Sequence, residues 1–490
     1  MRLSKLIEGI EKQVIYEGDW EREITVIATY SKEPLQSALF VCLQGNVDGH
    51  AYVEEAVKNG AVAVLTQKRV KISVPQIVVK DTREALAVLS SIFYGEPSLG
   101  VNVIGITGTN GKTTTSYMLS AILTAWGKRV GTIGTLGVRY LGKEYPCELT
   151  TPDPVFLQKT LREMADNGIE YVVMEVSAHA LFYKKVAGVN FRACIASNVT
   201  QDHLDFFKDM DEYARVKSLL FLPERCPLAI LNTDDKIIRS WARNREGFGA
   251  KTLTYGLRAP ADAFAIIQDG NAEQTRCVLN VLDEVIEVTL SFVGEHNVYN
   301  ALSAVSCAYA LGIDAESIRT GFSRLQGVSG RLERVATYNG ATVFVDFAHT
   351  PDGLKQSLSA LKEYCKRKLI CVFGCGGNRD KSKRSIMGKM VAETVDFSVL
   401  TADNPRYEDP LDIIADIEKG YREISKNYVI VPKREQAIAY AMERLEDGDI
   451  LLVAGKGGEK YQEIMGIKYP FEDNAIIKDL VGKRQENGVV

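Results

Sequence analysis

The chain has 490 residues, of which 46% are hydrophobic and 25% are charged, and its 59 lysines and arginines nearly balance its 63 aspartates and glutamates. This composition is typical of a globular protein with room for about three domains of roughly 150 residues each. A net charge of −4 argues against nucleic acid or an anionic membrane surface as the main partner, so we expect small-molecule substrates.

The cysteines and the N-terminus predict a cytoplasmic protein. The nine cysteines form no CxxC pair, and Cys42, Cys194 and Cys371 lie in apolar runs that favour buried, reduced thiols. The first 20 residues carry too many charges for a signal peptide, and no apolar run approaches the roughly 20 residues that a membrane span needs.

Residues 1–98 predict a small α/β domain. Three strand-like apolar segments alternate with helical patterns, and Pro97 and Gly100 then interrupt the alternation. The strands are expected at 39–43, 61–65 and 76–80, and the helices at 51–59 and 83–94.

Residues 99–328 begin with a strand, a glycine-rich turn and an amphipathic helix. The apolar run 101–106 indicates a buried strand, and a helical apolar face follows that Gly127 can end. The face consists of Leu119, Ile122, Leu123 and Trp126. This order of elements is typical of a phosphate-binding loop.

The turn itself reads GTNGKTTT. Gly108 and Gly111 allow backbone N–H groups to surround an anion, Lys112 adds a positive charge, and the Thr113 hydroxyl can bind magnesium. The pattern GxxxxGK[ST] would require glycine where Ile106 stands, so this is a tighter variant. The alternative interpretation is a loop in which the glycines only make a turn.

The rest of the chain continues the alternation of strands and helices. A parallel sheet is expected from 171–177, 192–198 and 227–232, and the period-two pattern in 263–292 predicts an antiparallel addition. Residues 297–311 are helical again. In residues 329–490, strands are expected at 341–347, 368–374, 397–403, 428–433 and 449–455. The sequence therefore predicts an α/β protein with a central phosphate-loop, parallel-sheet domain and a C-terminal Rossmann-like domain.

Polar residues directly follow several of these strands. In open parallel sheets ligands bind beyond the carboxyl ends of the strands, so Glu175 is a candidate magnesium ligand. Asn198, Asp202 and His203 follow the next strand and form a candidate metal or phosphate site. The alternatives are a solvated charge for Glu175 and a helix N-cap for Asp202. Four C-terminal strands also end in polar motifs, which should converge on one rim.

Ten motifs, in this order and over most of the chain, resemble those of the Mur ligases. They are GTNGKTTT, MEVSAHAL, SNVTQDHLDFF, YARVKSLLF, GEHNVYNALSA, GRLERV, VDFAHTPDGL, FGCGGNRDKSKR, DNPR and AGKGGEKY. The resemblance implies an N-terminal UDP-binding domain (1–98), a central ATPase domain (99–328) and a C-terminal amino-acid-binding domain (329–490). It also implies a cytoplasmic, monomeric peptidoglycan-synthesis enzyme that uses ATP and Mg²⁺ to form an amide bond through an acyl phosphate.

The resemblance carries residue roles onto matching positions of this sequence. Catalysis and magnesium binding are implied for Lys112, Thr113, Glu175, His203 and Lys217, with Lys217 carbamylated (N6-carboxylysine). From its helical surroundings alone, Lys217 would be a surface lysine. ATP contacts are implied for Gly108, Thr109, Asn110, Gly111, Lys112, Thr113, Thr114, Asn297, Asn300, Arg331, Asp346 and His349.

The implied substrates are UDP-muramoyl-dipeptide and meso-diaminopimelate. Matching positions for the first are Thr29, Ser31, Asn46, Val47, Asp48, Thr150, Thr151, Ser177, Tyr183 and Lys185. Matching positions for the second are Arg379, Asp403, Asn404, Pro405, Arg406, Gly455 and Glu459. A forked cation suits the carboxylate of the zwitterionic tip of meso-diaminopimelate, and amide or carboxylate oxygens suit its ammonium group. Alternatively, 403–406 is a helix-capping turn with a surface arginine.

The sequence departs from the family at several positions. Ala178 replaces a serine, and Tyr183 replaces a glutamine. Lys185 replaces an arginine, and a lysine lacks the bidentate fork of the guanidinium group. Further departures are Ser329 in the glycine-rich junction, Gly458 in AGKGGEKY, FEDNAI near the C-terminus and TYSK in the uracil segment. Because no metal or phosphate ligand is lost, ATP-dependent ligation is expected, and the alternative is a family ligase for another amino acid, such as L-lysine, or another acyl substrate. A non-catalytic ATP-binding paralogue would have lost Lys112, Glu175, His203 or Lys217, and all four are present.

Overall fold

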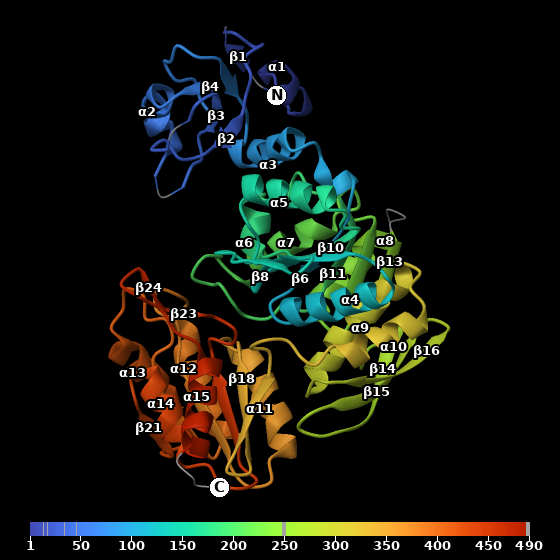
Figure 1. Ribbon diagram of the computed structural model, residues 1–490, viewed down its shortest axis with the longest axis vertical. Helices are drawn as coiled ribbons and strands as arrows, with labels where there is room; N and C mark the ends of the chain where they lie inside the picture. The colour runs from blue at the N-terminus through green and yellow to red at the C-terminus, as the bar shows by residue number, and fades with distance from the viewer. Residues whose placement is uncertain (13, 17, 34, 46, 247–250, 487–490) are drawn as a thin grey trace. The chain divides into compact units, whose positions relative to one another are not determined.

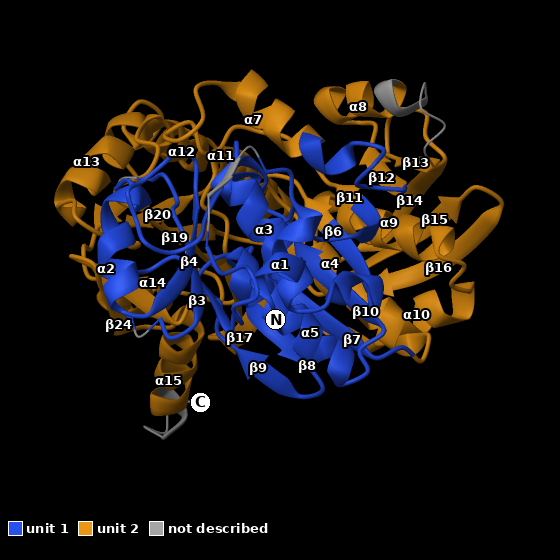
Figure 2. Ribbon diagram, turned by 90° about the horizontal axis from the view of Figure 1, so that it is seen from above, with its two compact units in different colours: residues 1–105, 128–194, 219–227 blue, residues 106–127, 195–218, 228–490 orange. Residues whose placement is uncertain are grey.

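A computed structural model describes residues 1–490 except 13, 17, 34, 46, 247–250 and 487–490 (Figure 1). The chain divides into two compact units, which Figure 2 colours separately. Unit 1 comprises residues 1–105, 128–194 and 219–227, and unit 2 comprises residues 106–127, 195–218 and 228–490. Strands β6 (Asn102–Thr107) and β11 (Phe191–Ala196) contribute residues to both units.

The N-terminal part of unit 1 is the predicted α/β domain. Its sheet has the strand order β1-β5-β4-β3-β2, with β1 antiparallel to β5 and the other neighbours parallel. The elements are α1 (Leu3–Leu6), η1 (Ile7–Gly9), β1 (Val14–Tyr16), β2 (Val26–Ala28), β3 (Ala38–Val41), η2 (Gly49–Tyr52), α2 (Val53–Lys58), β4 (Ala61–Thr66), β5 (Gln76–Val78), α3 (Thr82–Phe93) and η3 (Pro97–Leu99). The three predicted strands are confirmed, whereas β1 and β2, three residues each, are too short to show a pattern.

The rest of unit 1 supplies strands and helices of the central domain. Strand β10 runs parallel to β7, and β7, β8 and β9 form an antiparallel meander that the sequence pattern did not predict. The elements are β7 (Val130–Gly134), β8 (Gly137–Tyr140), β9 (Lys143–Tyr145), α5 (Pro154–Asp166), β10 (Tyr171–Glu175), α6 (Ala178–Phe182) and η4 (Leu219–Phe221). Pro154 occupies the first turn of α5, where its missing N–H costs nothing.

In unit 2, the helix after the phosphate loop packs against two later helices. A Cβ on Gly321 of α10 would lie 2.6 Å from the Ile122 Cα of α4, so only glycine permits this approach. Strands β12, β13 and β14 are parallel neighbours, and β14, β15 and β16 form the predicted antiparallel addition. The elements are α4 (Lys112–Ala125), α7 (Met210–Ser218), β12 (Leu228–Asn232), α8 (Lys236–Glu246), β13 (Lys251–Tyr255), β14 (Ala263–Gly270), β15 (Thr275–Val281), β16 (Glu284–Leu290), α9 (Glu295–Ala310) and α10 (Ala315–Arg324).

The C-terminal part of unit 2 is the predicted Rossmann-like domain, orange to red in Figure 1. Its sheet has the order β17-β18-β22-β19-β20-β21, in which only the edge strand β17 among these pairs is antiparallel. The elements are β17 (Glu333–Tyr338), β18 (Ala341–Asp346), α11 (Pro351–Tyr364), β19 (Leu369–Phe373), α12 (Ser382–Thr394), β20 (Phe397–Leu400), α13 (Pro410–Tyr421), β21 (Tyr428–Ile430), α14 (Arg434–Met442), β22 (Ile450–Ala454), β23 (Tyr461–Ile464), β24 (Ile467–Pro470) and α15 (Asp473–Glu486).

Alternating side chains of these strands pack into two hydrophobic cores, one on each face of the sheet. Leu452 of β22 joins the cluster under α11, α12 and α13, whereas its neighbours Leu451 and Val453 join the cluster under α14 and α15. Successive strand residues point to opposite faces, so the sheet is buried on both sides. The carboxyl ends of the strands are therefore where polar side chains remain accessible to a ligand.

Two further expectations concern the whole chain. Every cysteine of the described residues is a free thiol, and Cys42, Cys194 and Cys371 are buried as predicted. Within the described residues, no helix combines the length and the apolar character that crossing a membrane requires.

Candidate active site

The phosphate loop has the predicted strand, turn and helix. Gly108 and Gly111 adopt φ angles of +152° and +87°, and a Cβ there would lie 1.8 Å from Ser197 Oγ and 2.3 Å from Asn300 Oδ1, respectively. The Lys112 Nζ donates to the carbonyl oxygens of Gly108 (2.8 Å) and Thr109 (3.0 Å). The loop thus requires glycine at both positions, and its lysine lies over the loop.

The segment after β11 shapes this loop. The Asn110 backbone N–H donates to Asn198 Oδ1 (2.9 Å), and Ser197 Oγ donates to the Asn110 carbonyl (2.6 Å). Thr109 Oγ1 donates to the Thr200 carbonyl (3.1 Å). Asn198, which the sequence suggested as a phosphate or metal position, therefore holds the backbone of the loop.

Two asparagines of α9 lie beside the loop. Asn300 is the residue that a Cβ on Gly111 would strike, and its Nδ2 donates to Asn297 Oδ1 (3.0 Å). Asn297 Nδ2 in turn donates to the Val293 carbonyl (2.9 Å). The structure therefore brings Asn300 to the predicted ATP site and places Asn297 behind it, and Thr113 and Thr114 are buried in the first turn of α4.

Asp202 and His203 form an ion pair after β11. His203 Nε2 lies 3.2 Å from Asp202 Oδ2, and Lys383 Nζ lies 3.8 Å from Asp202 Oδ1. Burial opposes ionisation of Asp202, but electrostatic interactions, chiefly with His203 and Lys383, outweigh it and lower its pKa to about 2. Asp202 caps no helix, and His203 has a left-handed φ of +57°.

Lys217 is buried in α7, not on a surface. Its residue is 1% exposed, and its Nζ lies 4.7 Å from the centroid of the Tyr213 ring. Burial, together with the charge of Lys112, lowers the pKa of Lys217 well below the usual lysine value. The expectation from local sequence alone was wrong because the helix face that carries Lys217 is covered by tertiary contacts.

The end of β18 brings C-terminal residues to the phosphate loop within unit 2. Arg331 Nη2 donates to Thr113 Oγ1 (2.8 Å), and its guanidinium lies 4.4 Å from the centroid of the Phe347 ring. Asn110 Nδ2 donates to Asp352 Oδ2 (3.1 Å). Asp352 was not singled out from the sequence, although it follows a strand within VDFAHTPDGL at the start of α11.

Asp346 and His349 make their hydrogen bonds within the C-terminal domain. Asp346 Oδ1 accepts from the Ala348 backbone (2.8 Å) and from Ser357 Oγ (3.1 Å), and burial raises its pKa. His349 Nδ1 bonds the Phe347 carbonyl (2.8 Å), so Nδ1 carries the hydrogen and Nε2 is the basic nitrogen. Burial and the charge of Lys383 lower the pKa of His349, which favours the neutral ring.

Glu175, in unit 1, is a buried and oriented carboxylate. It is 2% exposed and accepts from the Thr135 backbone N–H (3.0 Å) and the Thr135 hydroxyl (3.1 Å). A Cβ on Gly134 would lie 2.2 Å from Glu175 Oε1, so glycine is required there. The alternative of a solvated charge is wrong. Thr135, which the sequence did not reveal, also contacts Thr150 (3.2 Å).

Three of the other predicted acyl-substrate residues, Thr150, Thr151 and Ser177, are linked by hydrogen bonds, directly or through Thr151, to Glu175 or to its partner Thr135, whereas Tyr183 and Lys185 have other partners. Thr151 Oγ1 donates to the Glu175 carbonyl (2.9 Å) and accepts from the Ser177 backbone N–H (3.0 Å). Lys185 Nζ pairs with Asp153 Oδ1 (2.7 Å), and the Tyr183 ring lies under the Arg83 guanidinium, 4.3 Å from centroid to Cζ.

The predicted uridine residues lie in the N-terminal sheet region. Ser31 Oγ donates to Glu55 Oε2 (2.6 Å), Val47 is 58% exposed, and Thr29 is half-buried. Asp48 bonds His50 and lies 3.0 Å from Lys68 Nζ, and hydrogen bonds from His50 lead the interactions that lower its pKa. Asn46 lies outside the described residues.

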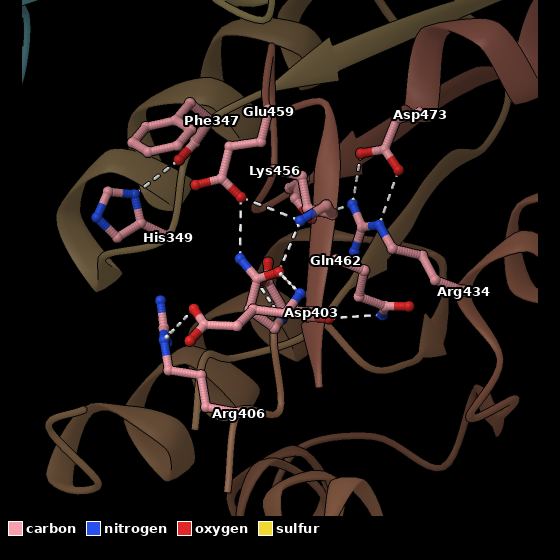
Figure 3. Close-up of polar contacts among 12 residues, drawn as sticks. Phe347, His349, Asp403, Arg406, Arg434, Lys456, Glu459, Gln462 and Asp473 are labelled. Carbon is pink, nitrogen blue, oxygen red and sulfur yellow. Dashed lines mark hydrogen bonds and ion pairs between the residues drawn. The ribbon is translucent and has the colours of Figure 1, made fainter. Parts of the chain in front are cut away.

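The predicted amino-acid residues form one cluster, which we call the amino-acid cluster (Figure 3). Lys456 is fully buried and its Nζ donates to Asn404 Oδ1 and Glu459 Oε2, both at 3.0 Å. Asn404 Nδ2 donates to Glu459 Oε2 (2.9 Å), so both side chains have fixed orientations. The cluster comprises Arg379, Asp403, Asn404, Pro405, Arg406, Gly455, Lys456 and Glu459.

The arginines of the cluster lie close together. A Cβ on Gly376 would lie 2.9 Å from Arg406 Nη1 and 3.8 Å from Arg379 Cγ. Arg406 has a φ of +52°, and its guanidinium bonds Glu463 Oε2 (3.1 Å) and the Gly377 carbonyl (2.8 Å). Residues 403–406 are therefore not a capping turn, because Asp409 caps the next helix, α13.

A buried ion pair lies behind the cluster. Arg434 donates to both carboxylate oxygens of Asp473 (2.8 and 2.7 Å) and to the Ala454 carbonyl (3.0 Å). A Cβ on Gly455 would lie 2.4 Å from Asp403 Oδ2 and 4.0 Å from Arg434 Nη1. Lys456 stood in a quoted motif, but no sequence signal pointed to Arg434 or Asp473 because their partners lie far along the chain.

Comparison with known proteins decides the family. The chain is 40% identical over 486 residues to UDP-N-acetylmuramoyl-L-alanyl-D-glutamate–2,6-diaminopimelate ligase of Bacillus licheniformis, covering 98% of this chain and 99% of that protein. The enzyme of the same name from Bacillus velezensis is 39% identical over 481 residues, covering 96% and 97%. This chain belongs to the Mur ligase family.

Three descriptions of Mur ligase domains match successive parts of the chain. They are the Mur ligase family catalytic domain (23–94), the Mur ligase middle domain (106–308) and the Mur ligase glutamate ligase domain (330–457). A solved UDP-N-acetylmuramoyl-L-alanyl-D-glutamate–2,6-diaminopimelate ligase superposes with a TM-score of 0.71 at 28% identity, covering 99% of both chains. The protein is thus an ATP-dependent Mur ligase with the three-domain α/β architecture of the family, which confirms the predicted fold and enzyme class.

Proposed function

We propose that this Mur ligase joins meso-2,6-diaminopimelate to the D-glutamate of UDP-N-acetylmuramoyl-L-Ala-D-Glu, in cytoplasmic synthesis of peptidoglycan precursors. The observation that carries the choice of amino acid is the amino-acid cluster, in which two arginines lie beside a carboxylate, an amide and Glu459. Full-length relatives at 36–40% identity that carry this activity in their names support it.

The cluster suits the far end of meso-diaminopimelate. That end is a zwitterion, with a carboxylate and an ammonium group on one carbon. Arg406 and Arg379 supply forked donors for the carboxylate, and Asp403, Asn404 and Glu459 supply oxygens for the ammonium. Lysine has no carboxylate at this end, so it would form no charge-assisted hydrogen bond with either guanidinium group.

ATP would activate the D-glutamate carboxylate. The carboxylate oxygen attacks the γ-phosphorus, the bond to ADP breaks, and an acyl phosphate forms. The amine of the incoming amino acid then attacks the carbonyl carbon, and phosphate leaves from the tetrahedral intermediate with loss of a proton from the amine. Both steps gather negative charge, which Lys112 and Arg331 are positioned in unit 2 to neutralise.

Magnesium is the proposed metal cofactor. We propose Thr113, Glu175, His203 and carbamylated Lys217 as its ligands, a set in which oxygen donors predominate, as magnesium prefers. Glu175 is buried and already oriented by Thr135, and Asp202 adds a buried negative charge beside His203. When bound, magnesium would neutralise the phosphate oxygens of ATP.

The buried Lys217 supports the proposed carbamate. Its lowered pKa favours the uncharged amine, which can attack carbon dioxide: a bond from nitrogen to carbon forms, a proton leaves the nitrogen, and a carbamate anion results. The product has carboxylate-like oxygens in place of the amine. Its negative charge would be stabilised by the positive charge of Lys112.

The remaining assignments follow from the positions that match the motifs of the family. We propose that Thr29, Ser31, Asn46, Val47 and Asp48 bind the uridine end of the sugar nucleotide, and that Thr150, Thr151, Ser177, Tyr183 and Lys185 bind its muramoyl-peptide end. We also propose that Gly108 to Thr114, Asn297, Asn300, Asp346 and His349 bind ATP. The enzyme is proposed to act as a monomer with three domains, 1–98, 99–328 and 329–490.

A phosphate-release assay tests this function. The enzyme is given ATP, magnesium and UDP-muramoyl-dipeptide with meso-diaminopimelate, L-lysine or L-ornithine at equal concentration, and reactions without an amino acid serve as blanks. We expect release with meso-diaminopimelate to exceed release with the other two. A preference for lysine or ornithine would refute the amino-acid assignment, and no release with any of them would point to a different acyl substrate.

A further inference from the structure

The segment after α6 departs from the family, and each of its long side chains has a partner. Tyr183 stacks under Arg83, Lys184 Nζ lies 3.0 Å from Asp81 Oδ2 and also bonds Glu84, and Lys185 pairs with Asp153. These partners offset the positive charges of both lysines. Tyr183 and Lys184 therefore join this segment to helix α3 of the N-terminal domain.

Arg83 connects this segment to a second one. Its Nη2 donates to the Gln44 carbonyl, in the turn after β3 that also carries Asp48. A Cβ on Gly45 would lie only 3.9 Å from the same nitrogen. The edge of the planar Arg83 guanidinium thus contacts the turn assigned to uridine. Its face lies over the ring of Tyr183, which is assigned to the muramoyl-peptide.

The surrounding backbone fixes this arrangement. Asp81 caps α3 by accepting from the Arg83 and Glu84 backbone N–H groups, and the same carboxylate pairs with Lys184. Lys184 has a φ of +55°, a conformation that a non-glycine residue keeps only when its surroundings hold it. A Cβ on Gly188 would lie 2.4 Å from the Ala87 carbonyl, so the chain here runs directly against α3.

We propose that Arg83 is a positioning residue for the sugar nucleotide, and that Tyr183 acts as its platform. By bridging Gln44 and Tyr183, the guanidinium holds the two ends of one extended binding site at a set spacing. This inference rests on the proposed function, because it requires a substrate that spans both segments.

The side chains involved are suited to mutation. Arg83 and Tyr183 are half-buried, so shortening them leaves no large cavity in the core. The variants are Arg83→Ala, Tyr183→Ala, Tyr183→Phe and the double alanine variant. Arg22→Ala is the matched control, since it removes an arginine of the same domain whose ion pair with Asp19 is exposed.

The test is the Michaelis constant of each substrate in the phosphate-release assay, together with the melting temperature. We expect Arg83→Ala and Tyr183→Ala each to raise KM for UDP-muramoyl-dipeptide by roughly tenfold, with kcat and the KM values for ATP and the amino acid within about twofold. Tyr183→Phe keeps the aromatic face and should raise this KM by less than Tyr183→Ala does. Because the two residues act as a unit, the double variant should be no worse than either single one.

Three results would overturn the inference. They are an unchanged KM for the sugar nucleotide, a parallel rise in all three KM values with a fall in melting temperature, and additive effects in the double variant. Each would make the stack a structural contact only. A wild-type enzyme that turns over no UDP-muramoyl-dipeptide would instead refute the proposed function itself, so the two failures are distinguishable.

Discussion

Two ion pairs of equal length lie in the two regions that we assign to substrates. Lys456 and Glu459 of the amino-acid cluster are 3.0 Å apart with side chains 0% and 22% exposed, whereas Lys68 and Asp48 of the uridine region are 3.0 Å apart with side chains 59% and 42% exposed. The first pair is held by burial and by Asn404, and the second is open to water and screened.

The difference reflects what each region has to recognise. A small zwitterion is distinguished from lysine by one carboxylate, which requires charges held in fixed places and shielded from water. A large sugar nucleotide offers many contacts, so no single exposed pair needs to contribute much. We therefore expect substitutions in the amino-acid cluster to have large effects, and substitutions in the uridine region to have small ones.

Lys456→Met is expected to have the largest effect on stability. It removes a buried cation that donates to both Glu459 and Asn404, and breaking a buried pair in this way costs roughly 3 to 5 kcal/mol. Because Glu459 is still reached by water, we expect about 3 kcal/mol, measured by urea unfolding. An effect below about 1 kcal/mol would show that burial does not distinguish the two regions.

Lys217→Ala extends the comparison to a second buried lysine. Burial disfavours the charged form of this lysine. We expect turnover to fall by about 10²-fold or more, with partial rescue by acetate in place of the carbamate. Stripping carbon dioxide should lower wild-type activity, and bicarbonate should restore it. Wild-type activity that is indifferent to carbon dioxide, with no rescue of the variant, would refute the carbamate.

The same lysine predicts a pH dependence. In carbon dioxide-free buffer, the unfolded state binds a proton at Lys217 that the folded state does not, because burial lowers the folded pKa. This group therefore makes the unfolding free energy rise with pH between its lowered folded-state pKa and the ordinary lysine pKa of about 10.4. The slope should be smaller in Lys217→Met, measured by urea unfolding at several pH values.

Arg406→Ala tests recognition in the amino-acid cluster. We expect KM for meso-diaminopimelate to rise by roughly 10²-fold, because a charge-assisted pair with a carboxylate is worth about 3 kcal/mol. Lysine, which lacks that carboxylate, should be used about as poorly as by the wild type. Equal losses for both amino acids would mean that Arg406 acts through its contacts with Glu463 and Gly377.

Lys68→Met should have the smallest effect. The exposed pair with Asp48 is worth at most about 1 kcal/mol, so stability should change by less than that and KM for the sugar nucleotide by less than about fivefold. Compared with Lys456→Met, this variant tests how burial changes the contribution of two ion pairs that have the same length. A loss as large as that of Lys456→Met would place Lys68 directly on the substrate.

The sequence by itself determined the phosphate loop, the strand-rich C-terminal domain and the family. These features are local: a strand, glycines and a helix follow one another within residues 101–127, and apolar periodicity marks β18, β19, β20 and β22. The antiparallel strands β7 to β9 and β17 escaped prediction, because only their neighbours in the sheet define them.

Only the tertiary structure decided which side chains meet. Lys456 reaches Asn404 and Arg434 reaches Asp473 across long stretches of chain, and Arg83 meets Tyr183 because α3 packs against the segment around Gly188. Burial of Lys217 likewise depends on what covers α7. Sequence patterns record the period of an element and its exposed face, whereas charge, orientation and burial depend on partners that folding brings together.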